Sequence, residues 1–124
     1  MFKIDADLTI ACTRGDAATF FIAAKVNDIS YVFRAGDEVR FTVVGKKDYS
    51  QVVLQKSVIV AEETERVEIS LTGEETKIGE PISKPVDYWY EVELNPNINP
   101  QTIIGYDENG AKVFRLYPES EVGI

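Results

Sequence analysis

The chain has 124 residues, 44% of them hydrophobic, and a formal net charge of −8 that arises from 21 acidic and 13 basic residues. This length and composition suit one domain, which we place at residues 1–124, and they exclude wholesale disorder. The acidic balance and the scattered basic residues exclude nucleic acid and anionic membrane as natural partners, because both bind clustered Lys and Arg.

Alternation of apolar and polar residues dominates the chain. Val39, Phe41 and Val43 alternate with polar neighbours, which is typical of a strand with one buried face. No long segment carries the apolar stripe of a helix. Seven to nine short strands separated by turns predict an all-β sandwich or barrel. The expected strands, in chain order, are 8–13, 17–24, 31–33, 38–43, 51–60, 66–71, 88–94, 102–108 and 111–117.

Asn109-Gly110 is the clearest turn signal. Both residues tolerate positive φ, so the pair suits a two-residue type I′ hairpin. We expect this turn to join 102–108 to 111–117.

One short helical turn is expected near residues 73–79. Thr72-Gly73-Glu74-Glu75 matches a capping box, in which Thr72 is the N-cap and Glu75 reaches back to it. Gly79 then supplies a stop, and Pro81 prevents continuation. Such a turn suits the crossing of the chain between the two sheets of a sandwich.

The chain lacks the residue types on which common catalytic sites depend. It contains no His and a single Cys, Cys12, which lies in the apolar run 8–13. A reactive thiol needs a base and a zinc site needs several His or Cys ligands, so we expect Cys12 to be buried and inert. Carboxylates are abundant near turns and ends, but they do not form the pattern of a calcium-binding loop. The sequence also lacks the glycine-rich pattern of a phosphate-binding loop. We therefore expect no enzyme, no cofactor and no metal site.

Arg14-Gly15-Asp16 is an integrin-binding tripeptide when it is displayed on an exposed loop. We interpret it as a tight turn between two strands, in which Gly15 supplies positive φ and Asp16 bonds the backbone.

Tyr88-Trp89-Tyr90 is the densest aromatic cluster. Alternation places Tyr88 and Tyr90 on the inward face and Trp89 on the outward face beside two glutamates. An exposed Trp89 would be a stacking platform for sugar rings or a hot spot for a protein partner, whereas the alternative is an ordinary core strand. The candidate contact residues are aromatic: Tyr88, Trp89, Tyr90, Tyr106, Phe114 and Tyr117.

Three features follow one another along the chain. Arg14-Gly15-Asp16 precedes an apolar strand, the run 31–43 contains the pattern aromatic–x–x–Gly–Asp–x–Val–x–Phe, and Tyr88-Trp89-Tyr90-Glu91-Val92 forms an aromatic and acidic strand. Over roughly residues 8–94, this order resembles the N-terminal immunoglobulin-like domain of bacteriophage baseplate upper proteins and related prophage tail proteins. The ending differs, because the chain has a predicted hairpin where this family has one final strand.

The resemblance implies an antiparallel immunoglobulin-like β-sandwich and a structural role in a phage or prophage tail or baseplate. The implied partners are other virion or tail proteins, or further copies of the chain. The location would be the virion, assembled in the host cytoplasm, since the sequence shows no secretory signal and no apolar stretch of the roughly 20 residues that a membrane helix needs. The terminal hairpin 102–117 is then a candidate sheet edge and contact surface.

Two other functions remain open at this stage. One is a carbohydrate-binding or adhesin-like module, which requires an exposed and coplanar aromatic strip around Trp89. The other is a glycosidase-type hydrolase, which requires two carboxylates that face each other across a cleft, one of them with an abnormal pKa.

Overall fold

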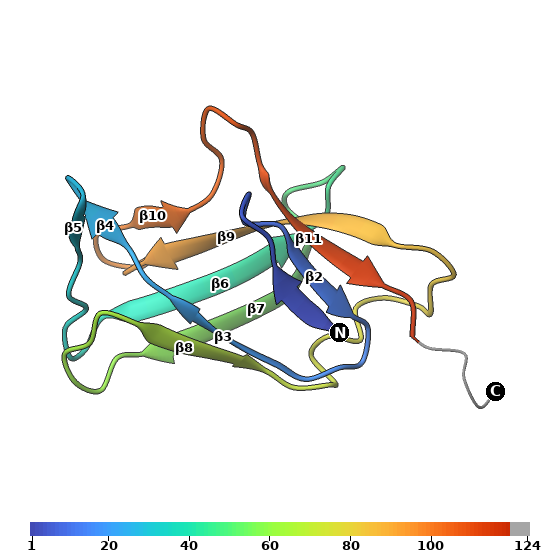
Figure 1. The fold of residues 1–124 in the computed structure, drawn as a ribbon, viewed down its shortest axis with the longest axis horizontal. Coiled ribbons are helices and arrows are strands. Elements are labelled where there is room, and N and C mark those ends of the chain that lie inside the picture. The colour runs from blue at the N-terminus through green and yellow to red at the C-terminus, as the bar shows by residue number, and fades with distance from the viewer. Residues whose placement is uncertain (120–124) are drawn as a thin grey trace.

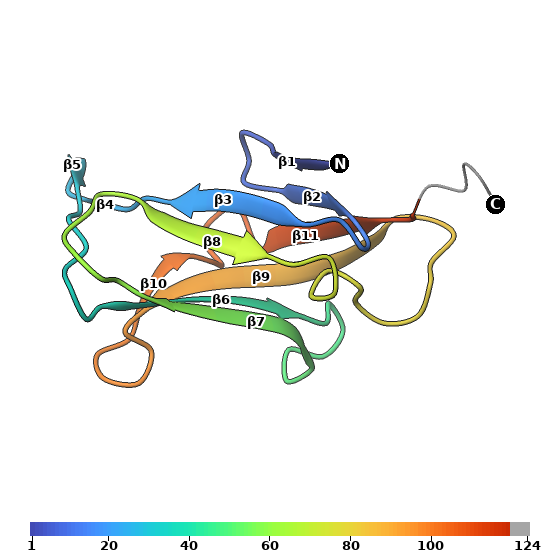
Figure 2. The same cartoon turned by 90° about the horizontal axis from the view of Figure 1, so that it is seen from below.

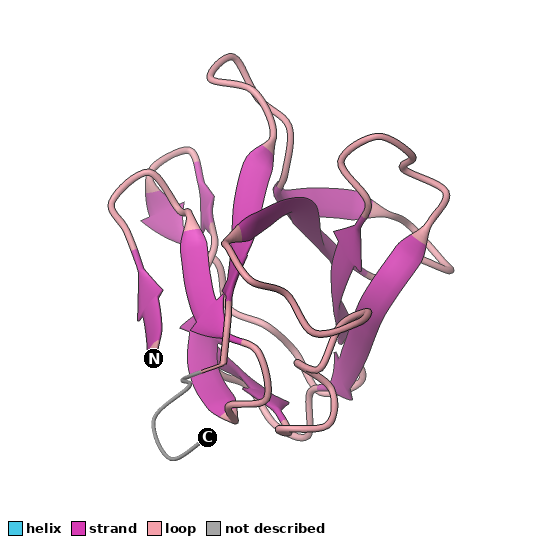
Figure 3. Cartoon of the chain, turned by 90° about the vertical axis from the view of Figure 1, so that its right-hand side faces the viewer, coloured by secondary structure: helices cyan, strands magenta, loops and turns pink. Residues whose placement is uncertain are grey.

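The computed structural model describes residues 1–119; residues 120–124, the end of the expected domain, lie outside the described residues. All eleven regular elements of the described part are β-strands, which are magenta in Figure 3. They are β1 (Phe2–Ile4), β2 (Ile10–Thr13), β3 (Ala18–Ile22), β4 (Lys25–Val26), β5 (Ile29–Ser30), β6 (Glu38–Val44), β7 (Val52–Ile59), β8 (Val67–Leu71), β9 (Val86–Leu94), β10 (Gln101–Ile104) and β11 (Lys112–Tyr117).

Seven strands form the main sheet, in the order β1-β2-β11-β9-β6-β7, and β10 pairs with the end of β9. The neighbours are antiparallel except for β2 and β11, which run parallel. β3 and β8 form a separate antiparallel pair, and β4 and β5 form a small hairpin. Figure 2 shows β3 and β8 as a layer beside the main sheet. The result is a two-layered, sandwich-like, all-β fold, which confirms the expected all-β class and mainly antiparallel pairing.

The core lies between these two layers. β3 and β8 bury every second residue, as half-exposed strands do. Phe20 of β3 packs edge-on against Phe41 of β6 with 5.3 Å between ring centroids. Phe41 also lies 5.6 Å from the ring of Tyr90 and 6.2 Å from that of Phe114. These rings join the small sheet to three central strands of the main sheet.

The expected helical turn near 73–79 is wrong. Its capping box forms: the Thr72 amide donates to Glu75 Oε1 at 2.8 Å, and the Glu75 amide donates to Thr72 Oγ1 at 3.1 Å. The segment nevertheless remains a hydrogen-bonded turn over residues 73–76, in which the fully buried Thr76 donates its hydroxyl to the carbonyl of Asp16. Two turns of helix at most could follow, too few to offset the cost of nucleation.

The expected hairpin between 102–108 and 111–117 is also wrong. β10 and β11 do not pair with each other; both pair with β9, β10 at its end and β11 along its first half. The turn itself shifts by one residue. Asp107 pairs with Gly110, so the central residues are 108 and 109, and within 107–110 only Gly110 has positive φ, 95°. β11 therefore lies between β2 and β9 in the interior of the sheet, so the expected edge is wrong for residues 112–117. β10 pairs with β9 alone among the described strands and does form an edge of the sheet.

A two-residue turn of the predicted kind occurs elsewhere. Asn27 and Asp28 have φ of 52° and 65° and join β4 to β5, with Val26 opposite Ile29. Positive φ at both central residues is the signature of the type I′ hairpin. Figure 1 shows the β4–β5 hairpin at one end of the molecule.

The predicted strand 31–33 is reduced to a single bridge between Phe33 and Thr64.

Within residues 1–119, no helix has the length and apolar character that crossing a membrane requires.

Replacement of Phe41 by Ala tests the core. Phe41 is fully buried and contacts three other rings, so we expect F41A to lower the free energy of unfolding by about 3–5 kcal/mol. Urea denaturation followed by far-UV circular dichroism measures it. The control Y106A removes a ring that is 79% exposed and should change stability by less than about 0.5 kcal/mol. Equal losses in both variants would contradict the proposed packing.

Candidate functional site

β9 has the alternation that the sequence predicted. Tyr90 is buried and Tyr88 is half-buried against the core, whereas Trp89 lies on the other face with Glu91 and Glu93. The Tyr90 hydroxyl donates to the carbonyl of Leu8, and burial raises its pKa. Tyr90 therefore serves mainly the core.

The other predicted contact residues divide in the same way. Phe114 is fully buried in the core, so its prediction as a contact residue is wrong. Tyr117 is half-buried at the end of β11. Tyr106 is exposed on the loop between β10 and β11 and remains a candidate together with Trp89.

Trp89 and Tyr106 line one groove of about 510 Å³. It lies between the loop that joins β6 to β7 and the loop that joins β10 to β11, and both loops project on the same side in Figure 1. Val44 and Ala111 add apolar surface, and Glu91 adds a carboxylate. Concave, mainly apolar surfaces with a few polar groups are typical of binding sites.

The groove arises where β9 changes neighbours. β11 pairs with β9 up to Tyr90, and β10 pairs with it from Val92 onward, so Glu91 has no strand partner on that side. The chain between them starts with Gly105, where a Cβ atom would meet Thr102 Cγ2 at 2.7 Å. The absence of a side chain at Gly105 lets the chain turn closely against Thr102 of β10 as the loop begins.

Tyr49 is a groove residue that the sequence interpretation missed. It lies in the loop between β6 and β7 and stacks on Trp89, with 4.9 Å between ring centroids and 24° between the planes. Tyr49 is 62% exposed, so its ring forms a wall of the groove rather than part of the core. The available signal was an aromatic residue inside a turn of charged and polar residues, where no core position requires one.

The charges around the groove differ in how they are balanced. Lys112 is 8% exposed, and its Nζ pairs with Asp107 Oδ2 at 2.8 Å. Glu91 has no such partner among the ion pairs of residues 1–119. Burial, and then the neighbouring charge of Glu93, raise the pKa of Glu91 above its usual range.

A glycosidase needs two carboxylates that face each other across a cleft. Glu91 and Glu93 do not have this arrangement, because both lie on the same strand, β9. In the described part of the chain, no three His, Cys, Asp or Glu residues gather into a group that could hold a metal ion.

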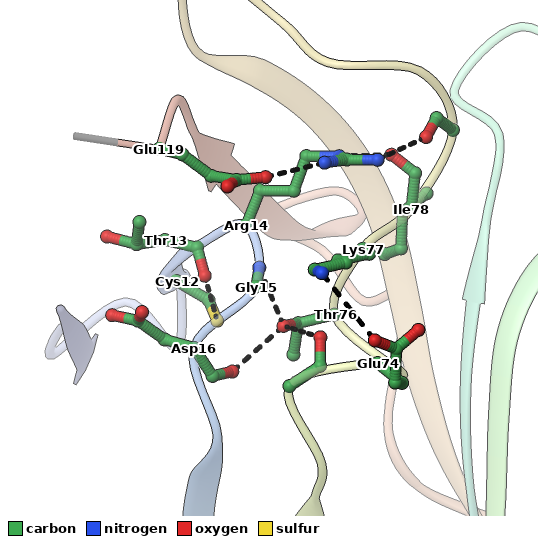
Figure 4. Close-up of polar contacts among 12 residues, drawn as sticks. Cys12, Thr13, Arg14, Gly15, Asp16, Glu74, Thr76, Lys77, Ile78 and Glu119 are labelled. Carbon is green, nitrogen blue, oxygen red and sulfur yellow. Dashed lines mark hydrogen bonds and ion pairs between the residues drawn. The ribbon is translucent and has the colours of Figure 1, made fainter. Parts of the chain in front are cut away.

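Arg14-Gly15-Asp16 has a structural role, as Figure 4 shows. Arg14 is only 8% exposed, and its guanidinium donates to the carbonyls of Ile78 and Gly79 at 3.3 and 2.6 Å and pairs with Glu119 at 2.6 Å. Gly15, with φ of 90°, donates its amide to Thr76 Oγ1. The interpretation of the tripeptide as a turn with Gly15 at positive φ is confirmed, and Arg14 is not displayed. The expected bond of Asp16 to the backbone of the turn is not seen, because its carboxylate pairs with the N-terminal ammonium of Met1.

Replacement of Arg14 by Ala tests this role. R14A leaves the carbonyls of Ile78 and Gly79 without their donor, so we expect a loss of about 2–3 kcal/mol in the free energy of unfolding. The control R34A removes an exposed arginine and should change stability by less than about 0.5 kcal/mol. Both values come from chemical denaturation. A neutral R14A would contradict a structural role.

Cys12 is fully buried, as predicted. Burial, and then the charge of Asp16, raise the pKa of its thiol to about 11. The reactive thiolate is therefore scarce at any pH well below this value.

Alkylation of Cys12 measures its burial. We expect iodoacetamide at pH 8 to modify the native protein at least about a hundredfold more slowly than the same protein in urea, since both access and thiolate are lacking in the folded state. Mass spectrometry at timed intervals gives the two rates. Similar rates in the two conditions would show that the thiol is accessible in the folded protein.

Comparisons with family models, curated proteins and solved structures found no match for this chain. The class that the fold and the groove define is an all-β, sandwich-like domain with an aromatic groove bounded by two loops.

Proposed function

We propose that the chain is a structural module of a phage or prophage tail or baseplate, and that it binds other proteins of the particle through the groove beside Trp89. The observation that carries the binding role is the groove itself: four of the residues that line it are aromatic, and two of these, Tyr49 and Tyr106, are largely exposed. Exposed aromatic residues around a depression are typical of the central anchors of protein interfaces. The virion assignment rests on the resemblance of residues 8–94 to the tail-protein family.

The proposal includes an immunoglobulin-like form of the sandwich, and the strand order supports it. In that fold, strands C, F and G share one sheet, C′ can extend it, and B and E lie in the other sheet. β6, β9 and β11 match C, F and G, β7 matches C′, and β3 and β8 match B and E. The structure differs from the standard pattern in its two-stranded second sheet and in β10, which extends the pairing of β9.

A carbohydrate-binding or adhesin-like module is the second candidate. Trp89, Tyr49 and Tyr106 beside a carboxylate are the residue types that bind sugar rings. A sugar platform needs a strip of exposed rings that lie side by side in one plane, however, whereas Tyr49 stacks on top of Trp89 with 4.9 Å between ring centroids. This contact makes the protein-binding function the better supported of the two.

Purified phage particles test the virion assignment. Particles are collected after prophage induction of a strain that carries the gene, banded on a density gradient and analysed by mass spectrometry. We expect the chain to band with the tail proteins. Its presence in the lysate but absence from the particles would contradict the assignment.

A groove variant tests the binding role in the same particles. We expect the double variant Y49A/Y106A to fold normally, because both rings are largely exposed, and to enter particles at least about tenfold less efficiently. The matched control I98A removes a side chain that is 87% exposed and does not line the groove. Equal incorporation of the two variants into particles would contradict a role of the groove in assembly. Titration with neutral oligosaccharides, with Trp89 fluorescence as the signal, tests the second candidate.

A further inference from the structure

Two carboxylates beside the groove lack a cationic partner within residues 1–119. Glu91 and Glu93 project from the same face of β9, and neither takes part in an ion pair there. Glu93 lies opposite Arg40 in the β6–β9 register, but the Arg40 guanidinium bonds Glu38 at 2.9 Å and Ser57 at 3.1 Å instead. An acidic pair of this kind is a site of uncompensated negative charge on the sheet.

Two basic side chains of the neighbouring strand β11 are already paired. Lys112, which lines the groove, is bound to Asp107, and Arg115 forms a two-point contact with Asp87 at 2.8 and 3.2 Å. The pKa of Glu91 is raised by burial and by Glu93, with no basic group that lowers it. The exposed Lys46, on the neighbouring loop, acts on Asp87. The charge of Glu91 is thus available to a cation from outside.

The aromatic side chains favour one kind of cation. Trp, and to a smaller degree Tyr, attract a cation to the ring face, and a planar guanidinium also stacks on such a ring. Trp89 and Tyr106 line the same groove as Glu91. A neutral sugar would use the rings but leave the carboxylate charge unbalanced, whereas a guanidinium satisfies both.

We propose that the groove between the β6–β7 and β10–β11 loops receives an arginine side chain from a partner protein, with the guanidinium against the aromatic rings and its charge facing Glu91 and Glu93. Charge complementarity favours this occupant: a chain of net charge −8 offers two carboxylates without an ion-pair partner among residues 1–119, and one of them, Glu91, lines the aromatic groove. This inference deepens the proposed function and rests on it only for the statement that the partner is a protein of the particle.

Trp89 is the single tryptophan of the chain, so its fluorescence reports directly on the groove. The probes are the blocked tripeptide Gly-Arg-Gly and two analogues that carry lysine or citrulline at the centre. Citrulline has nearly the shape of arginine but no charge. We expect a saturable signal with the arginine peptide in the millimolar range, binding at least about threefold weaker with lysine, and no saturation with citrulline. Equal responses to arginine and citrulline, or no saturation with arginine up to about 20 mM, would overturn the proposal.

Charge-neutral variants identify the carboxylates. E91Q and E93Q keep the side-chain shape, and we expect each to weaken the arginine peptide by about tenfold. The matched control E68Q removes an exposed glutamate on β8, in the other sheet, and should bind as the unchanged protein does. Undiminished binding by E91Q and E93Q would refute the assignment of the two carboxylates.

The outcome separates the two proposals. Arginine binding without incorporation into particles would contradict the virion function alone. Incorporation without arginine preference would contradict the inference alone.

Discussion

Phe41 is the residue on which the two layers of the fold depend. It is fully buried in β6, and its ring contacts Phe20 from the small sheet as well as Tyr90 and Phe114 from the neighbouring strands of its own sheet. A two-stranded sheet such as β3–β8 is marginal by itself, so its stability comes from burial of its apolar face on this cluster. Because Tyr90 belongs to β9, the same cluster orients the strand that carries Trp89.

The groove is a consequence of how the main sheet is completed. β9 is the longest strand, and two shorter strands share one of its sides, β11 along the first half and β10 at the end. The interval between them leaves Glu91 without a strand neighbour on that side and sends a loop outward past Trp89. The β6–β7 loop supplies the opposite wall through Tyr49. Pairing within the sheet, rather than any local motif, therefore creates the candidate site.

Away from the groove, buried polar contacts hold the ends of strands in place. Arg14 ties the end of β2 to the carbonyls of Ile78 and Gly79, and Thr76 ties the next turn to the same segment. The capping box at Thr72 contributes to this arrangement as a turn. Arg14-Gly15-Asp16 and the capping box at Thr72 therefore both lie where the chain crosses between the two layers, from β2 to β3 and from β8 to β9.

The sequence by itself determined the all-β class and the facing of residues within strands, because alternation is a local property of an extended chain. It placed Trp89 outward and Tyr90 inward, and it identified Cys12 as a buried thiol. Only the tertiary structure decided that β11 lies inside the sheet, that Arg14 is buried and that Tyr49 stacks on Trp89. These features depend on which distant segments pair, and pairing is set by the packing of the whole core rather than by neighbours in the chain. The aromatic groove, and with it the position of Glu91 without an ion-pair partner among residues 1–119, belongs to this second group.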